Sequence, residues 1–269
     1  MNAALIIDTA YFVAAFLFIY GLKRMSSPKT ARSGIIWAGA GMVVATLVTF
    51  LYPQILNAGF ERILLIAVAV GIGTIIAWGW AKRVAMTDMP QMVAIYNGMG
   101  GGAAGAIAAI ELIKEATGQG HLDGISITLG VLGGLIGSVS LTGSVVAWAK
   151  LDGRLNKAPK IPGGHRTNFV VLLIAVIAGL LVIAAEHPSP IVLGIFFATA
   201  LAFGIMMTLP IGGADMPVII SLYNALTGLA VSFEGYVLQN PAMIIAGMVV
   251  GAAGTLLTLL MAKAMNRSV

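Results

Sequence analysis

The sequence predicts an all-α protein, a polytopic bundle of about nine transmembrane helices that forms one transmembrane domain over residues 1–269. Hydrophobic residues make up 59% of the chain and charged residues only 9%, whereas soluble domains carry about 25% charged residues. A water-soluble fold of this size could not bury so much apolar surface. The 34 glycines are typical of helices that pack closely in a bilayer.

Nine apolar stretches are long enough to cross a bilayer core, which takes roughly 20 helical residues. Charge, Pro or Gly bounds each stretch. The first lacks a basic leader and contains Asp8, so we interpret it as a retained span rather than a signal peptide. The stretches cover residues 3–22, 34–53, 62–81, 89–113, 123–149, 168–185, 189–208, 216–238 and 241–262.

The formal net charge of +5 indicates a bias of Lys and Arg toward cytoplasmic loops rather than binding of nucleic acid. Nearly all of the 15 basic residues fall on one side of the predicted topology, and only Arg62 and Lys114 fall on the other. The N-terminus is therefore predicted outside and the C-terminus in the cytoplasm. The basic segments are the loops 23–33, 82–88 and 150–167 and the C-terminal tail, which includes Lys263 and Arg267.

One motif occurs twice, at residues 88–98 and 215–225. Its Asp, Met, Pro, Tyr and Asn positions are identical, and Gly101 and Gly228 extend the match. Both copies begin a predicted span from the cytoplasmic side, so the repeat is predicted to be parallel rather than inverted.

Each copy begins with an aspartate, Asp88 or Asp215, followed by Pro. An aspartate suits a helix N-cap, where its carboxylate accepts hydrogen bonds from free backbone N–H groups, and Pro suits the first turn. Asn97 and Asn224 follow nine residues later, about 13 Å along a helix and near the middle of a bilayer. These asparagines either bond neighbouring helices or form a polar station on an ion or proton path.

Four hydroxyl side chains are predicted at the same depth in the fifth span, about 9–18 Å inward of Lys150. A water wire could use them as relays, or they could bond to carbonyls of their own helix. These residues are Ser138, Ser140, Thr142 and Ser144.

Titratable groups are predicted only away from the midplane. All three histidines fall in predicted loops, and Glu111 and Glu234 lie near the outer ends of their spans. Because Asn cannot carry a proton by changing charge, the titrating group of a proton path would belong to another subunit, or hydroxyls and water would carry the proton between carboxylates at the edges. The absence of Cys excludes thiolate metal sites, and no metal site is predicted.

Residues 100–105 match the dinucleotide fingerprint G-x-G-x-x-G. That fingerprint must follow a strand and open a helix in a βαβ unit, whereas this run lies inside a predicted span. The sequence therefore predicts close helix packing here, and no cofactor-binding site.

Four stretches together resemble the β subunit of proton-translocating NAD(P) transhydrogenase, and the resemblance covers the whole chain. The resemblance is to a bacterial type with a split α subunit. The stretches are residues 82–90, 142–147, 212–217 and 263–268.

The resemblance implies a translocase that couples proton movement to hydride transfer between NAD(H) and NADP(H), both bound on partner domains. In that family the NADP(H)-binding domain follows the membrane part of the β subunit, and it is absent from residues 1–269. The chain is therefore expected to lack the hydride-transfer sites and to bind no cofactor itself. Implied partners are the α subunits, including a companion membrane subunit, in a dimer of the whole complex in the bacterial inner membrane.

The resemblance also implies roles for individual residues. Asn224 matches an Asn that is important for proton conduction, and Ser144 lies in a functionally sensitive Thr-Gly-Ser stretch. Many members place the proton-binding His at the position of Asn97, and others carry it on the companion membrane subunit, so we expect a companion His facing Asn97. Residues expected to couple the membrane domain to the NADP(H) domain at the cytoplasmic end are Asp88, Asp215, Lys263 and Arg267.

Two other functions fit the same residues. A secondary transporter or ion channel would use a polar site between the repeats and would work without partners. A structural scaffold for a redox complex would keep its activity when Asn224 is changed.

Overall fold

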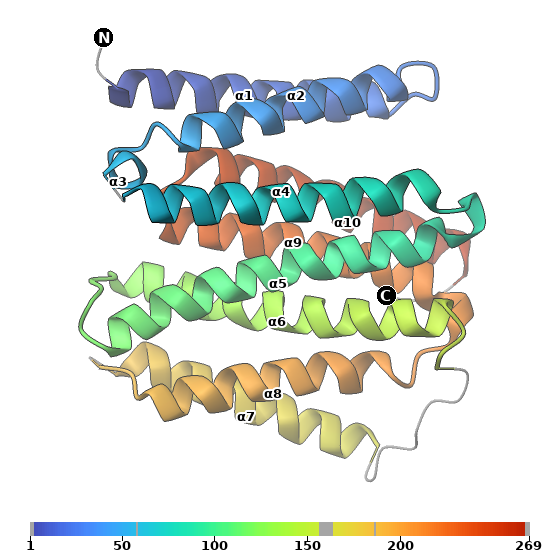
Figure 1. Ribbon diagram of the computed structural model, residues 1–269. Coiled ribbons are helices and arrows are strands. Elements are labelled where there is room, and N and C mark those ends of the chain that lie inside the picture. The colour runs from blue at the N-terminus through green and yellow to red at the C-terminus, as the bar shows by residue number, and fades with distance from the viewer. Residues whose placement is uncertain (1–2, 58, 156–163, 186, 267–269) are drawn as a thin grey trace. The chain divides into compact units, whose positions relative to one another are not determined.

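The predicted fold class is confirmed. The computed structural model describes residues 3–57, 59–155, 164–185 and 187–266, and in these ranges it contains no strand and nine helices that are long and apolar enough to cross a membrane. Figure 1 shows these helices running side by side within each part of the chain. The chain is therefore an integral membrane protein.

The helices follow the predicted spans to within a few residues at each end. One difference in the type of secondary structure concerns His165, which was predicted in a loop but is the first residue of a helix. The nine spanning helices are α1 (Ala3–Met25), α2 (Ala31–Thr49), α4 (Phe60–Arg83), α5 (Met89–Ala116), α6 (Gly124–Leu151), α7 (His165–Ala184), α8 (Pro190–Thr208), α9 (Met216–Val237) and α10 (Pro241–Ala264). Three short elements join them: α3 (Pro53–Leu56), η1 (Met86–Asp88) and η2 (Gly213–Asp215).

The chain divides into two compact units, residues 1–84 and 85–269. In the first unit, α1 and α2 form an antiparallel hairpin in close contact: a Cβ added at Gly34 would lie 2.6 Å from the carbonyl oxygen of Gly21. The Arg24 Nε donates a hydrogen bond to Ser33 Oγ at 2.8 Å near the hairpin turn.

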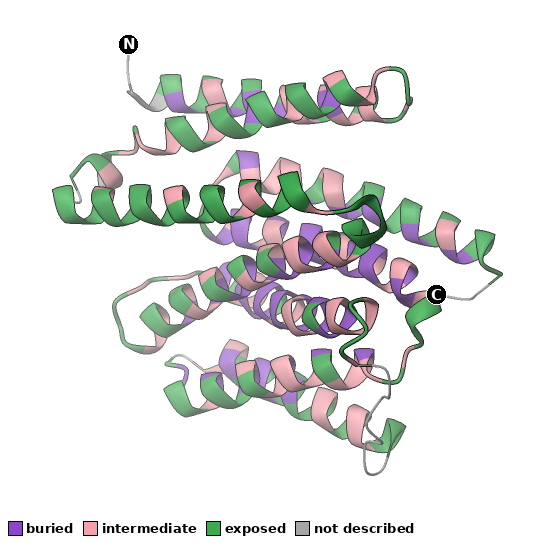
Figure 2. Cartoon of the chain, turned by 45° about the vertical axis from the view of Figure 1, so that its right-hand side comes forward, coloured by how far each residue is buried: buried purple, intermediate pink, exposed green. Residues whose placement is uncertain are grey.

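The second unit has α6 and α9 at its centre. In an apolar stretch of 18 residues in each helix, half of the residues of α6 and 56% of those of α9 are buried, compared with 22% for α7 and for α10. Figure 2 shows the buried residues gathered on these central helices. Lipid tails are as apolar as the side chains, so membrane helices gain little free energy by burying apolar surface against one another. Burial in this unit therefore identifies the surfaces at which helices pack together.

Contacts with α6 fix the direction of its two neighbours. On α5, Gly98 faces Ser144 and Gly101 faces Ser140, so residue numbers rise along α5 as they fall along α6. On α9, Tyr223 packs on Gly143 and a residue further along bonds to Ser140, with the same reversal. Both helices are antiparallel to α6 and thus parallel to each other, which confirms a parallel repeat.

The two motif copies adopt the same local structure, a 3-10 turn followed at once by a helix with Pro in its first turn. Asp88 and Asp215 do occupy the N-cap positions, but the prediction that their carboxylates cap the helix is wrong, because neither makes a side-chain cap hydrogen bond. The preceding 3-10 turn leaves them with ψ of 3° and −5°, whereas a capping side chain needs an extended backbone.

The glycine-rich run at residues 100–105 lies inside α5 and packs on α6, as predicted. A Cβ at Gly101 would lie 2.9 Å from the Ser140 Cβ and 3.0 Å from the Gly137 carbonyl oxygen. Gly247 and Gly251 likewise allow α9 and α10 to pack closely, since a Cβ at Gly247 would lie 2.4 Å from the Ser232 nitrogen.

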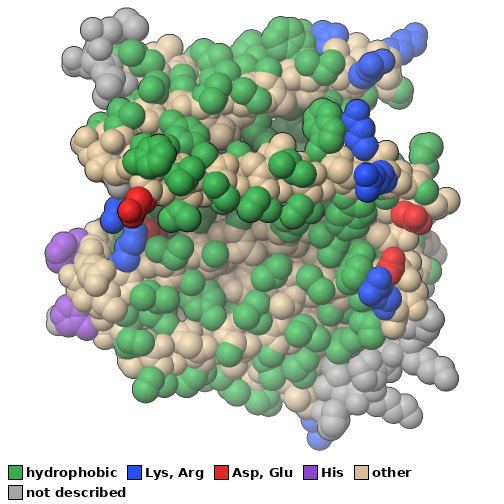
Figure 3. Space-filling model, viewed as in Figure 1, with side chains coloured by type: hydrophobic (Ala, Val, Ile, Leu, Met, Phe, Trp, Pro, Cys, Tyr) green, Lys and Arg blue, Asp and Glu red, His purple; other side chains and the backbone are tan. Residues whose placement is uncertain are grey.

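Hydrophobic side chains cover the flanks of the helices and charged side chains gather at helix ends, as Figure 3 shows. This is the pattern of a protein with lipid around it. The membrane orientation inferred from Lys and Arg stays a prediction, and three of its basic residues, Lys157, Lys160 and Arg267, lie outside the described residues.

Asp123 caps α6 with an extended backbone: its Oδ1 accepts a hydrogen bond from the Ser126 N–H at 3.1 Å. Hydrogen bonds from the Ser126 side chain and backbone hold the pKa of Asp123 below its usual range. The stabilisation is therefore present above the ordinary carboxyl pKa and is lost as pH falls through the lower, folded-state pKa.

We expect Asp123→Ala to lower the melting temperature of the detergent-solubilised protein at neutral pH, and the gap from wild type to close in acid. The measurement is the melting temperature of both proteins against pH. Asp123→Asn keeps an acceptor at every pH and serves as the control, since it should show a gap that does not vary with pH. A gap of constant size for Asp123→Ala would contradict the assignment.

Candidate functional site

A cluster of buried polar side chains joins the three helices α5, α6 and α9. Asn97 on α5 is 8% exposed, and its Nδ2 donates hydrogen bonds to Ser144 Oγ at 2.9 Å and to Ser140 Oγ at 3.3 Å. Both acceptors are on α6 and fully buried. The two N–H groups of the amide are thereby satisfied across a helix interface.

Ser140 links this pair to α9. Its Oγ shares a hydrogen bond of 2.5 Å with Thr227 Oγ1 and donates to the Tyr223 carbonyl at 3.2 Å. Asn97, Ser140 and Thr227 thus form one chain of hydrogen bonds across three helices. We call the set Asn97, Ser140, Ser144 and Thr227 the three-helix cluster.

Thr227 was not among the residues predicted for the site. It lies three residues after Asn224, and the equivalent position of the first copy is Gly100. A Cβ at Gly100 would lie 3.3 Å from the Thr227 Cγ2, so the glycine leaves room for the threonine. The repeat itself carries the signal, because a polar residue in one copy faces a glycine in the other.

A second buried pair lies one helical turn away on α9. The Tyr223 hydroxyl and Thr208 Oγ1 of α8 share a hydrogen bond of 2.5 Å, and both side chains are fully buried. The tyrosine ring fills the space beside Gly143, where a Cβ would lie 2.4 Å from the ring. Tyr223 belongs to the repeated motif, although the sequence had assigned it no role.

Two of the four predicted hydroxyls do not join the three-helix cluster. Thr142 faces α8, where its Oγ1 donates to the Leu201 carbonyl at 2.8 Å. It also bonds to the Ser138 carbonyl of its own helix, the bond that the alternative interpretation expected. Ser138 is buried and packs against Gly105 of α5.

The two asparagines of the repeat are unequal. Asn224 is half-buried, and its side chain makes no hydrogen bond to the part of the chain that the structure describes. The Asn97 Oδ1 is buried and also lacks a partner among the described residues, although both N–H groups of that amide are bonded. Buried polar atoms are normally hydrogen-bonded, so this unpaired acceptor distinguishes Asn97 from the other members of the three-helix cluster.

A family model described as "NAD(P) transhydrogenase beta subunit" matches residues 7–269. The chain belongs to the NAD(P) transhydrogenase beta subunit family. It is similar to the NAD(P) transhydrogenase subunit beta of Rhodospirillum rubrum, and to that subunit from a named strain of the species, each 39% identical over 266 residues, or 97% of this chain and 56% of the relative. The chain spans about half the length of the curated relatives it matches.

In this transhydrogenase β-subunit family member, the residues expected to couple to a neighbouring domain lie at one end of the second unit. The parallel helices α5 and α9 begin there, with Asp88 and Asp215 at their N-caps. Helix α10 ends there, because it is antiparallel to α9: Gly228 faces Gly251 and Gly235 faces Ile244.

The structure describes one of the two basic residues expected at that end. Lys263 is exposed in the last turn of α10. Arg267 lies outside the described residues. Sequence reasoning assigned no role to Lys150, whose Nζ donates hydrogen bonds to the Leu209 carbonyl and to the Ile211 carbonyl, the latter at 2.5 Å. That lysine ties the end of α6 to the end of α8.

Residues that could bind a metal do not converge in the described ranges, where no group of three or more His, Asp or Glu side chains occurs. What the transhydrogenase family member does bring together within its spanning helices is hydroxyl and amide groups. Such groups can pass protons along hydrogen bonds but cannot store one by changing charge.

Proposed function

We propose that residues 1–269 form the proton-conducting membrane domain of an NAD(P) transhydrogenase, in which hydride transfer between NAD(H) and NADP(H) takes place on partner domains. The observation that carries the proposal is the three-helix cluster, a continuous set of buried hydrogen bonds inside apolar spanning helices. Polar groups at such depth are costly and tend to mark pathways.

The length of the relatives supports the proposal that proton conduction and hydride transfer take place on different domains. This chain matches 56% of the R. rubrum β subunit, so the relative has further sequence in which an NADP(H)-binding domain could lie. We propose that the hydride-transfer sites lie in such regions and on the α subunits, that the complex is a dimer, and that it resides in the bacterial inner membrane. The chain itself binds no cofactor in this proposal.

The unpaired Asn97 Oδ1 supports a companion membrane subunit. A buried acceptor without a partner is satisfied most simply by a donor from another chain, and a protonated or neutral imidazole can donate N–H. We propose that a histidine on the companion subunit faces Asn97 and is the group that titrates. A complex whose companion helices hold no histidine near Asn97 would overturn this part of the proposal.

Asp88, Asp215, Lys263 and Arg267 are proposed to couple the membrane domain to the NADP(H) domain. The helix ends that carry the first three gather at one end of the second unit. Because α5 and α9 also carry Asn97 and Thr227, a shift at their first turns would be transmitted along rigid helices to the three-helix cluster.

Asn224→Ala, placed in the full complex, is expected to lower proton pumping and coupled hydride transfer together by several-fold. Asn224 lies within a turn of Thr227, and its amide is not committed to another bond in the described chain. The measurement is acidification of proteoliposomes alongside the rate of hydride transfer. Asn168→Ala on α7 removes another amide remote from the cluster, and we expect it to pump as wild type does.

Unchanged pumping by Asn224→Ala would contradict a conduction role for that residue. A secondary transporter is distinguished by the same preparation. If the isolated chain, without partner subunits, carried a solute across the vesicle membrane, the transhydrogenase proposal would fail and the transporter would stand.

A further inference from the structure

Glu234 on α9 is an acidic side chain enclosed by protein. It is fully buried, and neither carboxyl oxygen has a hydrogen-bond partner in the part of the chain that the structure describes. The carboxyl group lies against the backbone of α6, since a Cβ added at Gly133 would lie 2.1 Å from Oε1. Glycine at position 133 is what makes room for the acid.

Glu234 continues the polar stripe of α9. Tyr223, Thr227 and Glu234 stand at positions i, i+4 and i+11, which fall on one face of a helix, and all three meet α6. Their partners there run in strict antiparallel order, Gly143, Ser140 and Gly133. Seven residues at 1.5 Å each place Glu234 about 10 Å beyond Thr227 along α9.

Between Glu234 and the three-helix cluster, Ala230 is a buried residue of α9 about one turn from Thr227 and one turn from the acid. The acid is the next polar group on this face of α9 after Thr227.

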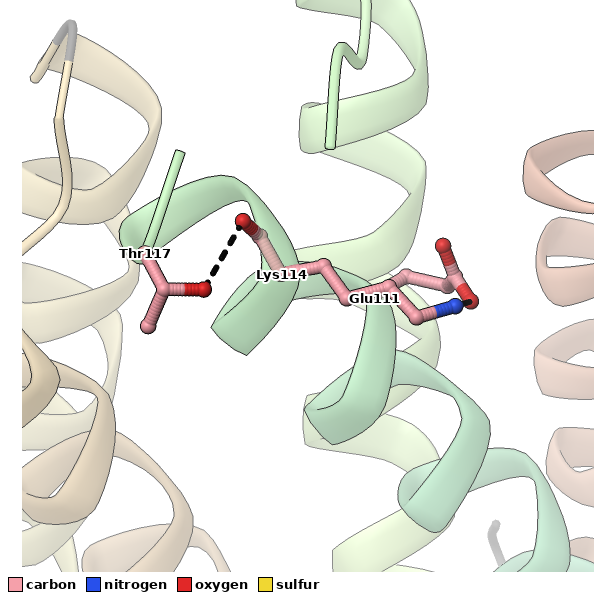
Figure 4. A network of polar contacts seen from close by, with 3 residues as sticks. All are labelled: Glu111, Lys114 and Thr117. Carbon is pink, nitrogen blue, oxygen red and sulfur yellow. Dashed lines mark hydrogen bonds and ion pairs between the residues drawn. The ribbon is translucent and has the colours of Figure 1, made fainter. Parts of the chain in front are cut away.

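The charged groups around Glu234 do not neutralise it. From α5, the acid Glu111 acts on it electrostatically, and the Glu111 carboxylate is itself paired with Lys114 Nζ at 2.6 Å, as Figure 4 shows. From α6, Asp123 lies ten residues beyond Gly133, at the cap of the helix. Helix α10 presents Met243 and Ile244 beside Gly235, both uncharged.

The Glu111–Lys114 pair lies nearer to the end of the domain than Glu234. Helices α5 and α9 are parallel, with Gly100 level with Thr227, so Glu111 is level with residue 238, one turn beyond the buried acid. The side chains of Glu111 and Lys114 are 20% and 46% exposed. Glu111 is thus a partly exposed charged group one turn beyond the buried acid.

An unpaired carboxylate in this position would be costly, and burial favours the neutral acid. Addition of a proton to one carboxylate oxygen forms the neutral acid, and loss of that proton toward the hydroxyls of Thr227 and Ser140 restores the carboxylate, with no change in electron count. We propose that Glu234 is a proton-binding group of this chain, which exchanges protons between the end of the domain at Glu111 and the three-helix cluster. The proposal rests on the proposed function and adds a titratable group within this chain to it.

The test uses the full complex in proteoliposomes. Glu234→Gln keeps the size and the neutrality of the protonated acid, so the packing against Gly133 is retained, but it cannot release a proton. We expect proton pumping and coupled hydride transfer to fall at least about tenfold. Glu234→Asp keeps the carboxyl group and is expected to retain part of the activity with a displaced pH profile. Glu61→Gln, an acid in the first turn of α4, is the matched control and should pump normally.

A second readout does not depend on pumping. Infrared difference spectra of the complex between high and low pH should contain the C=O band of a protonated carboxyl group, absent from Glu234→Gln and moved in Glu234→Asp. A band unchanged in both variants overturns the assignment, even if a variant is poorly active for other reasons. Equal pumping by wild type and Glu234→Gln overturns it as well. A wild-type complex that moves no protons overturns instead the proposed function on which this inference rests.

Discussion

Replacement of Ser140 by alanine is expected to lower proton translocation and coupled hydride transfer at least about tenfold in the full complex. Its hydroxyl is the point at which all three helices of the cluster meet: it accepts from Asn97, shares a bond with Thr227 and donates to the Tyr223 carbonyl. Loss of one oxygen breaks the chain between α5 and α9 and leaves a buried hydroxyl on Thr227 without its partner.

The rates are measured in proteoliposomes by vesicle acidification and by cofactor absorbance. Thr128→Ala is the matched control, because this hydroxyl is on the same helix but bonds only to the Gly124 carbonyl of its own first turn. We expect the control to keep wild-type rates. If Ser140→Ala also kept them, the three-helix cluster would be a packing device and not part of a proton path.

Gly137→Ala is expected to give the largest loss of stability, about 3 kcal/mol. The added Cβ would lie 2.7 Å from the Gly101 carbonyl oxygen and 2.7 Å from the Gly105 nitrogen. These are backbone atoms of α5, and no side-chain rotation can move them, so α5 and α6 would have to separate. Separation would also stretch the bonds from Asn97 to Ser140 and Ser144.

The measurement is reversible unfolding of the detergent-solubilised protein by heat or by a denaturing detergent. Gly194→Ala on α8 makes the same chemical change where a Cβ meets nothing within 4 Å, and alanine favours a helix over glycine. We expect the control to match wild type or exceed it slightly. Equal stability of the two variants would show that α5 and α6 are not in tight contact.

The spans were predictable because length and hydropathy decide whether a helix can cross a bilayer. The same local rules failed at three helix starts. Asp88 and Asp215 had the right residue type for a side-chain cap, but the 3-10 turns before them set a backbone angle that the cap cannot use. His165 was predicted in a loop because it is polar, yet a polar residue at the first position of a helix costs little.

The site was predictable in part. Depth along the helices was enough to group Asn97 with Ser140 and Ser144, whereas the direction each side chain faces depends on how the helices pack. That is why Thr142 turned out to face α8 and why Thr227 was missed. Glu234 was predicted near an outer span end, a place that suggests contact with water, and only packing against Gly133 reveals its burial.

The bond between Ser140 and Thr227 has a consequence for timing. Each hydroxyl has one hydrogen, so the bond has a direction at any instant. Thr227 is the donor while the Ser140 hydrogen goes to the Tyr223 carbonyl, and Ser140 is the donor when its hydrogen turns to Thr227 instead. Under the proposed function, a proton that hops through the pair reverses that direction, and a second proton cannot follow until both hydroxyls have rotated back. Rotation requires the hydrogen bond between Ser140 and Thr227 to break briefly. The distance between α6 and α9 therefore sets the time that the pair needs before it can pass the next proton. A small change in that distance would then alter the rate of turnover while the same residues still formed the path.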